Sequence, residues 1–127
     1  MEPAQALADL TEISSQVEAA VLFEEGGNVA GSTLPDAAAA DALARAAGDL
    51  LARASSLGGG TVTQVEVSTP TGSVFVVRDG TRLIAATTAA DPTTGLVFYD
   101  LKSALRGSDG ETKPRRRRTT KKADDAA

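Results

Sequence analysis

Few residues in this chain of 127 belong to the types that most often perform chemistry. Histidine and cysteine are both missing, which excludes imidazole general bases, thiolate nucleophiles and zinc sites of the usual Cys/His kind. Glu24 and Glu25 are adjacent carboxylates, the residue type that glycosidases use in pairs. Neighbouring residues at the end of a strand point to opposite sides, so these two cannot flank one glycosidic bond. We interpret them as the exposed tip of a hairpin.

Motifs for phosphate binding and for nucleophilic catalysis are missing as well. No lysine directly follows a glycine, so the chain has no GxxxxGK[ST] loop and is not itself a P-loop GTPase. The triple glycine at residues 58–60 follows a predicted helix instead of opening one, which favours a helix stop over a phosphate loop. No GxSxG motif is present, and Lys102 is the only lysine before residue 107 that could serve a serine. We therefore predict no catalytic residue, no metal and no cofactor.

Charge is distributed unevenly along the chain. Residues 1–106 hold six basic and thirteen acidic residues, whereas residues 107–127 hold seven basic and four acidic ones. An acidic body does not fit a globular nucleic-acid binder, whose folded face should be basic. The segment "KPRRRR" with "KK" could contact nucleic acid, anionic lipid or an acidic surface, or it could simply be solvated. No aromatic residue lies among these charges, so any nucleic-acid contact would involve phosphates only and would weaken with salt.

The uncharged stretches are short. Runs such as "LIAATTAA" are far below the roughly 18 residues expected of a membrane span. The first residues carry acids where a secretory leader would be basic and then apolar. We expect a cytoplasmic protein without a membrane span.

The first part of the chain reads as a helix followed by a hairpin. Apolar residues at spacings of three and four predict an amphipathic helix over residues 3–18, with Leu7, Leu10, Ile13, Val17 and Ala20 on one stripe. Residues 21–23 and 29–32 then form two short strands around the turn Glu-Gly-Gly-Asn.

The next segment is the strongest helix signal in the sequence. Asp36 is placed to begin it, alanines give it high propensity, and the triple glycine ends it. The predicted buried stripe is Leu43, Ala46, Ala47, Leu50, Ala54 and Leu57. Two i,i+4 pairs, Asp41 with Arg45 and Asp49 with Arg53, are expected on another face. A smooth side made of Ala38 to Ala40, Ala44, Ala47 and Gly48 either allows a second helix to approach or simply reflects helix propensity.

Three strands and a helix complete the predicted order. The segments "TVTQVEVST", "SVFVVR" and "TRLIAATT" are separated by "TPTG" and by Asp79-Gly80, which are turn sequences, so we expect an antiparallel meander. Val97, Leu101, Ala104 and Leu105 repeat at helical spacing after a cap at Thr93 or Thr94. This last helix of about ten residues should end at Gly107 in the left-handed conformation. The predicted domain covers residues 1–106, and residues 107–127 are predicted to be a disordered tail.

This order of elements resembles the roadblock family of dynein light chains and bacterial gliding-motility regulators. The resemblance covers roughly residues 4–106 and rests on "AAVLFEEGGNVAGST", the alanine-rich helix and "RDGTRLIAATTAADPTTGLVFYDLKSAL". The Pro-Gly pair that many relatives place before the first strand is absent from "SSQVEAAV". The resemblance implies an α+β, roadblock/profilin-like fold of order α-β-β-α-β-β-β-α. Its five-stranded antiparallel sheet would have strand order 2-1-5-4-3, with helices on both faces.

The resemblance also implies a function without catalytic residues. Family members typically form homodimers through the third strand and the second helix and bind small Ras-like GTPases, some of them promoting GTP hydrolysis. The implied function is a regulatory or scaffold module that modulates a GTPase cycle. The alternative is a structural subunit of a signalling or motility assembly that touches no GTPase. The candidate interface residues are Asp41, Ala44, Arg45, Ala47, Gly48, Arg53, Val62, Gln64 and Glu66.

Overall fold

The computed structural model describes residues 2–58 and 60–109. Its elements are α1 (Pro3–Ile13), β1 (Val17–Glu24), β2 (Val29–Ser32), α2 (Ala37–Gly58), β3 (Gln64–Thr69), β4 (Gly72–Asp79), β5 (Arg82–Ala89) and α3 (Thr94–Asp109). This is the predicted order of helices and strands. The predicted tail beyond residue 109 lies outside the described residues.

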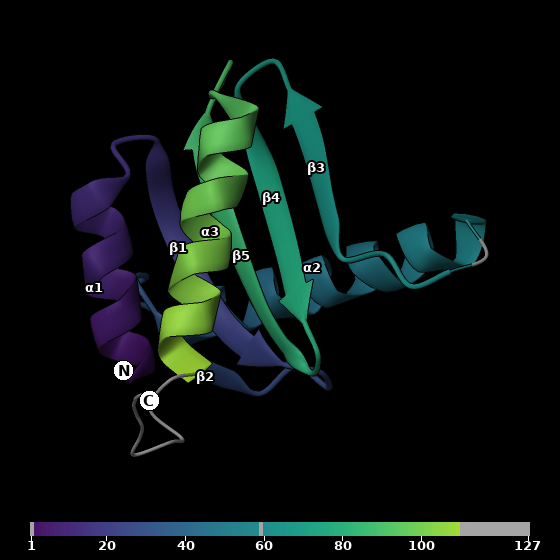
Figure 1. The fold of residues 1–127 in the computed structure, drawn as a ribbon, viewed down its shortest axis with the longest axis horizontal. Coiled ribbons are helices and arrows are strands. Elements are labelled where there is room, and N and C mark those ends of the chain that lie inside the picture. The colour runs from purple at the N-terminus through teal and green to yellow at the C-terminus, as the bar shows by residue number, and fades with distance from the viewer. Residues whose placement is uncertain (1, 59, 110–127) are drawn as a thin grey trace, which may run out of the picture.

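The strands form one antiparallel sheet with the order β2-β1-β5-β4-β3, which confirms the predicted fold class. Helices α1 and α3 lie side by side on one face of the sheet, and α2 crosses the other face (Figure 1). The hairpin turns use glycines in the left-handed region, with φ of 102° at Gly26, 98° at Gly27 and 66° at Gly80. Because the strand order places β2 and β3 outermost, these two strands are the edges of the sheet, as predicted for the third strand.

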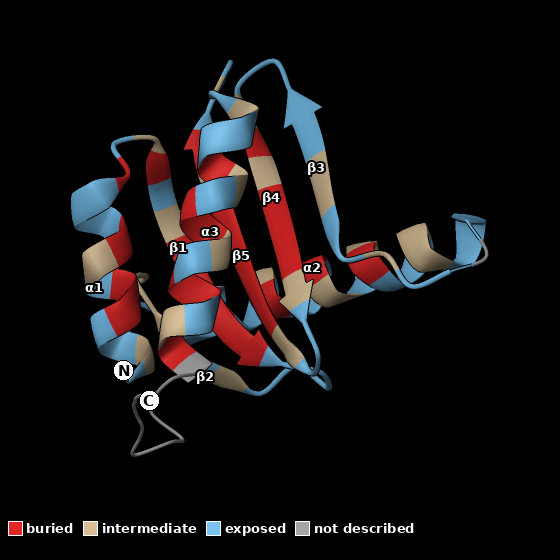
Figure 2. Cartoon of the chain, in the orientation of Figure 1, coloured by how far each residue is buried: buried red, intermediate tan, exposed pale blue. Residues whose placement is uncertain are grey.

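Two hydrophobic clusters fill the space on either side of the sheet. Phe75, Val77 and Ile84 face α1 and α3, and Phe75 packs edge-on against Phe98 of α3 with ring centroids 5.0 Å apart. Val76, Leu83 and Ala85 face α2. Strands β1, β4 and β5 each contain a run of consecutive buried residues (Figure 2), which agrees with the apolar runs of their sequences.

Helix α1 is shorter than the apolar spacing predicts. It ends at Ile13, whose side chain is 72% exposed, and the Ser14 N–H donates to the Leu10 carbonyl at the C-cap. Val17 and Ala20, which we expected on the helical stripe, lie instead in β1 and pair with β5. The predicted helix end was wrong because the serines at 14 and 15 favour leaving the helix, and the following residues gain a ladder of cross-strand hydrogen bonds.

Helix α3 is longer than predicted. The helix begins at Thr94, after the Thr93 carbonyl accepts a hydrogen bond from the Val97 N–H, as expected for a cap at this point. It then continues through Gly107 to Asp109, so the predicted left-handed stop at Gly107 was wrong. Ser108 is fully buried, accepts a hydrogen bond from the Arg82 guanidinium at 2.9 Å and donates to the Leu105 carbonyl. These contacts make the last turn of α3 part of the packed domain.

Among the described residues, none of the helices combines the length and the apolar character needed to cross a bilayer.

Candidate partner interface

Groups of side chains that commonly form metal sites are missing from the described part of the chain. No group of three or more acidic residues lies close enough to hold a metal ion in residues 2–58 and 60–109, and the whole chain lacks histidine and cysteine. Glu24 and Glu25 lie at the end of β1 and in the β1–β2 turn, both exposed, as predicted. What the structure does offer is surface on α2 and on the edge strand β3, where the candidate interface residues lie.

The buried face of α2 differs from the predicted stripe. Ala40, Ala44, Ala47 and Leu51 pack on the sheet, whereas Leu43 and Leu50 are half-buried and Leu57 is 88% exposed. The side chains beneath the helix are large, including Phe23 and Leu83, so small alanines fit above them better than leucines would. The sequence prediction placed the more hydrophobic side of the helix on the sheet. In the structure the side with most of the alanines lies on the sheet instead, because small side chains fit above the large ones beneath.

The side that α2 turns to the sheet also determines which of its candidate interface residues are buried and which are exposed. Ala44 and Ala47 are buried at 1% and 2% exposure, so this part of the smooth alanine side covers the chain's own sheet and cannot receive a second helix, whereas Ala38 and Ala39 are exposed. Gly48 is half-buried above Phe23. Asp41, Arg45 and Arg53 are exposed. Within this set on α2, the charged members are the most accessible to a partner.

The expected ion pairs on the outer face of α2 are not formed. In the described residues, Asp41 makes no ion pair with Arg45, and Asp49 makes none with Arg53. Exposed pairs at this spacing gain only a few tenths of a kcal/mol, which side-chain entropy easily offsets. Within the described part of the chain, helix α2 therefore presents two unpaired arginines to solvent.

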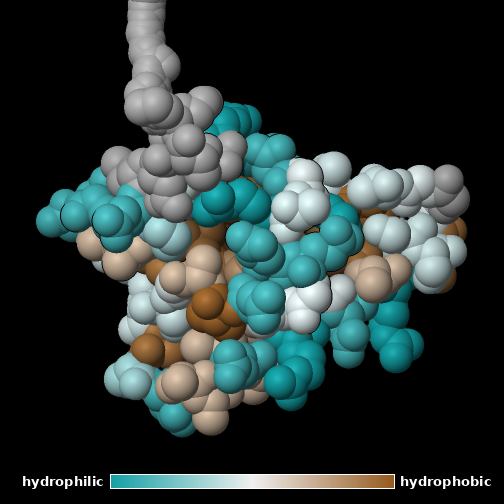
Figure 3. Space-filling model, turned by 90° about the horizontal axis from the view of Figure 1, so that it is seen from below, coloured by the Kyte–Doolittle hydropathy of each residue, from teal (hydrophilic) through white to brown (hydrophobic). Residues whose placement is uncertain are grey.

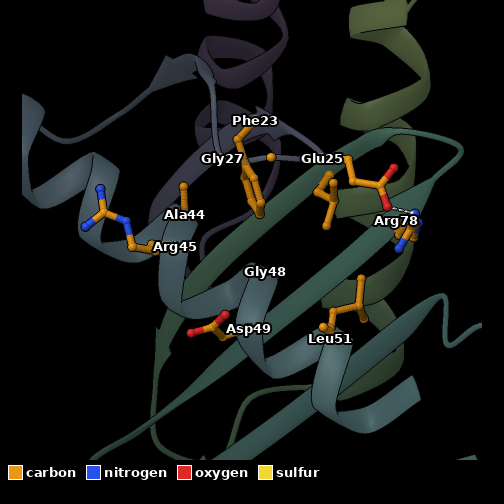
Figure 4. Close-up of a pocket in the computed structure, with 12 residues that line it drawn as sticks. Phe23, Glu25, Gly27, Ala44, Arg45, Gly48, Asp49, Leu51 and Arg78 are labelled. Atoms are coloured by element: carbon orange, nitrogen blue, oxygen red, sulfur yellow. Dashed lines mark hydrogen bonds and ion pairs between the residues drawn. The ribbon is translucent and has the colours of Figure 1, made fainter. Parts of the chain in front are cut away.

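A cavity of about 330 Å³ separates α2 from the tip of the β1–β2 hairpin (Figure 4). Phe23 points toward α2 beside Ala44 and Gly48, and on the far side the Arg78 guanidinium forms an ion pair with Glu25. Arg45 extends away from that pair, although it also lines the cavity. Arg78 and Glu25 already satisfy one another, so the cavity contains no free charge of theirs for a ligand.

Strand β3 separates the remaining candidates onto the two faces of the sheet. Gln64 and Glu66 pair with Val77 and Phe75, so they share the face covered by α3, and Glu66 lies 3.4 Å from the Thr94 hydroxyl. Val62 precedes the strand and packs on the α2 side, away from Gln64 and Glu66. The Val62 N–H donates to the Ser55 hydroxyl, and this bond ties the loop back to α2.

The outer edge of β3 has unpaired backbone groups within the described residues. The Thr63 carbonyl accepts the Arg78 N–H, and the register continues without a bulge to Thr69. Backbone groups alternate in direction along an antiparallel strand, so those of Gln64, Glu66 and Ser68 point away from β4. Such an edge is a template for another strand.

Apolar side chains gather where this edge meets α2. The C-terminal turns of α2 extend past β3, and apolar side chains are visible at that end of the molecule (Figure 3). We define this corner by Leu50, Val62 and Val65, which pack at the margin of the cluster beneath α2, together with Leu57 of α2 and Val67 of β3, which are 88% and 38% exposed. The corner was missed because Leu50 and Leu57 were assigned to the core. Their spacing of seven residues is equally typical of a seam between two helices.

Comparison with known proteins identifies the fold. No protein-family model matches the sequence, and no curated protein matches it at a significant level. The structure is similar to a Roadblock/LC7 domain from Streptomyces avermitilis, with a TM-score of 0.79 and 20% identity over 88% of this chain and 98% of that one. It is also similar to the gliding protein MglB from Thermus thermophilus, with a TM-score of 0.66 and 19% identity over 84% and 87% of the two chains.

A third neighbour is profilin II from Acanthamoeba castellanii, with a TM-score of 0.51 and 18% identity over 78% and 90% of the two chains. The class defined by the fold is a small antiparallel α+β domain with an open sheet edge at β3. Within that class the chain has the Roadblock/LC7 fold, as the resemblance predicted.

Proposed function

We propose that this chain is a non-catalytic regulatory module that forms a homodimer and binds a small Ras-like GTPase, whose GTPase cycle it modulates. The observation that carries the proposal is the corner where the open edge of β3 meets the overhanging, apolar end of α2. The resemblance supplies the class of partner. The absence of cysteine fits a reducing compartment, and we place the module in the cytoplasm.

The corner fits a second copy of the chain for two reasons. An open strand of six residues can pair with its own symmetry mate and continue the sheet, which satisfies the outward backbone groups of both chains. The same two-fold axis would bring the overhanging ends of two α2 helices together, so that Leu50 and Leu57 lose contact with water. A symmetric contact of this kind is closed and self-complementary.

The outer face of α2 is the surface on which we place the GTPase. Arg45 and Arg53 are exposed there and unpaired among the described residues, and they can reach acidic groups of a partner without first breaking an ion pair. Phosphoryl transfer depends mainly on positioning and on charge stabilisation, so a protein without histidine can accelerate it by fixing the partner's switch loops.

The direct test is to capture the GTPase from a cell lysate while the nucleotide bound to it is controlled. The tagged chain is incubated with lysate of its native cell in the presence of either GDP or a non-hydrolysable GTP analogue, and retained proteins are identified. We expect a P-loop GTPase to be retained in one nucleotide state more than in the other. Retention of large assembly subunits without any GTPase would favour the structural-scaffold alternative. Retention of nucleic acid through the tail would favour neither the GTPase-binding function nor the scaffold function.

A second prediction concerns the two arginines. Replacing Arg45 and Arg53 by alanine should weaken GTPase binding several-fold and leave the maximal hydrolysis rate nearly unchanged, because the contact positions the partner and supplies no catalytic charge. Single-turnover hydrolysis at saturating protein measures that rate. Arg106→Ala is the matched control, since this exposed arginine lies on α3 at the other face of the sheet. An arginine finger is worth roughly 10³-fold or more in rate, so a collapse of that size with intact binding would contradict the positioning role.

A further inference from the structure

Asp100 is a buried carboxylate without a partner among the described residues. It is 7% exposed in the middle of α3, and it makes no hydrogen bond or ion pair within that part of the chain. Its carboxylate keeps some contact with solvent, because the Ser14 hydroxyl is the one polar side-chain atom of the described residues that is fully buried without a hydrogen-bond partner. A nearly buried carboxylate gains more from a neighbouring cation than one in open water does, so the position of Asp100 suits a cation from outside the described residues.

Asp100 lines a cavity of about 290 Å³ between α1 and α3. Its walls are mostly apolar and include Leu10, Ile13 and Ala104, and Asp9 contributes a second carboxylate that already accepts a hydrogen bond from Gln5. None of the described residues that line it is basic. Tyr99 stands at the rim and is 67% exposed. Apolar walls, a buried carboxylate and an aromatic ring together match a guanidinium group, which pairs with carboxylates and stacks on rings.

The direction of the two helices relates this groove to the end of the domain. Helices α1 and α3 run antiparallel on the same face of the sheet (Figure 1). By their places along these helices, Ile13 and Tyr99 belong to one half of the groove and Ala6 and Gly107 to the other. The chain leaves α3 two residues after Gly107. The sequence that follows, residues 110–127, contains four consecutive arginines at 115–118.

The lengths are compatible with docking in the same chain. Asp100 lies about 13 Å along the helix from Asp109. Arg115 is six residues beyond Asp109, and an extended chain of that length spans up to about 20 Å. The opposite charges of the acidic body and the basic tail favour the contact and make it sensitive to salt.

We propose that the arginine-rich tail of this chain docks in its own α1–α3 groove and that an arginine of residues 115–118 pairs with Asp100 beside Tyr99. This groove lies on the face of the sheet opposite α2. The proposal therefore does not depend on the proposed dimer or on the GTPase.

The chain contains its own reporter for this contact. Tyr99 is the only tyrosine, and there is no tryptophan, so tyrosine fluorescence reports on the rim of the groove alone. Quenching by acrylamide measures how accessible that ring is. In the full chain at low salt we expect a quenching constant about half that of a full-length variant with Arg115, Arg116, Arg117 and Arg118 all changed to glutamine. The difference should vanish at about 1 M NaCl, where charges are screened within a few ångströms.

Two groove variants test where the tail binds. Asp100→Asn removes the charge with little change of shape, and Ser103→Lys places a competing cation on an exposed residue of the groove, so both should raise quenching to the level of the tail variant. Glu24→Gln is the control, because it changes an exposed carboxylate in the distant β1 end and should behave as the unmodified chain. Circular dichroism checks that each variant is folded.

Three results would overturn the proposal. The first is equal quenching of the full chain and of the arginine-to-glutamine variant. The second is unchanged protection of Tyr99 in both Asp100→Asn and Ser103→Lys. The third is protection that disappears on dilution, which would assign the groove to the tail of a neighbouring molecule.

Discussion

Two glycines of this chain occupy opposite situations in the packing. Gly48 lies inside α2, and a Cβ added there would meet the Phe23 ring at 3.9 Å, which is ordinary van der Waals contact. Gly72 begins β4, and a Cβ there would approach the Thr88 carbonyl oxygen to 2.5 Å, a distance that the backbone can relieve only by moving. The first glycine is a choice of sequence, whereas the second is required by the fold.

We expect alanine substitutions at these two positions to have opposite effects on stability. Gly48→Ala should raise the free energy of unfolding by about 0.5–1 kcal/mol, because alanine loses less backbone entropy in a helix. Gly72→Ala should lower it by about 1–3 kcal/mol through the backbone clash. Urea unfolding of both variants beside the unmodified chain measures the difference. Destabilisation by Gly48→Ala would mean that the glycine serves a close contact at this position with another chain.

At the scale of elements, the rotation of α2 about its own axis determines which of its residues can contact a partner. With the alanines turned to the sheet, the leucines are left at the margin of the helix, and the end of α2 extends past β3. The corner formed there is apolar although it borders solvent. Large exposed apolar groups beside an open strand are unusual for a domain that remains alone.

Leu57 is the residue through which the corner can be tested. Leu57→Arg should weaken homodimer formation by roughly 10²- to 10⁴-fold, since the symmetric contact loses two leucines, each contributing about 1.5–3 kcal/mol on burial, and about 1.4 kcal/mol corresponds to a factor of ten. The domain itself should stay folded because this side chain is 88% exposed. Light scattering over a range of micromolar concentrations gives the dissociation constant. Leu96→Arg, at a residue of α3 that is 50% exposed, should leave it unchanged, and equal losses in both variants would remove the corner from the interface.

At the scale of the whole molecule, dimerisation and stability should be linked. If the folded chain associates and the unfolded chain does not, the thermal midpoint must rise with protein concentration by mass action. We expect an increase of several degrees between about 5 and 100 µM, measured by scanning calorimetry. The Leu57→Arg variant should show a smaller dependence. A midpoint that is constant across this range would contradict the homodimer.

The sequence by itself determined the order and type of the elements. The hairpins depended on local signals such as Asp79-Gly80 and Gly26-Gly27, whose backbone conformations are set by the residues of the turn. Alternation and buried runs located the strands, and the resemblance supplied their order in the sheet. The exclusion of histidine and cysteine chemistry also follows from composition alone, because it does not depend on where any residue lies.

Tertiary structure decided the points at which two local patterns compete. Val17 fits a helical stripe and a strand equally well, and pairing with β5 placed it in β1. Gly107 is a common helix stop, yet α3 continues past it because Ser108 finds Arg82 on β5. Ala47 and Leu50 both suit a core, and the packing of α2 on the sheet buried the alanine and left the leucine half-buried. Asp100 looks like any helical acid in the sequence, and only the packing of α1 against α3 encloses it without a partner among the described residues. Such choices depend on residues far apart in the chain, so they become visible only when the elements are packed.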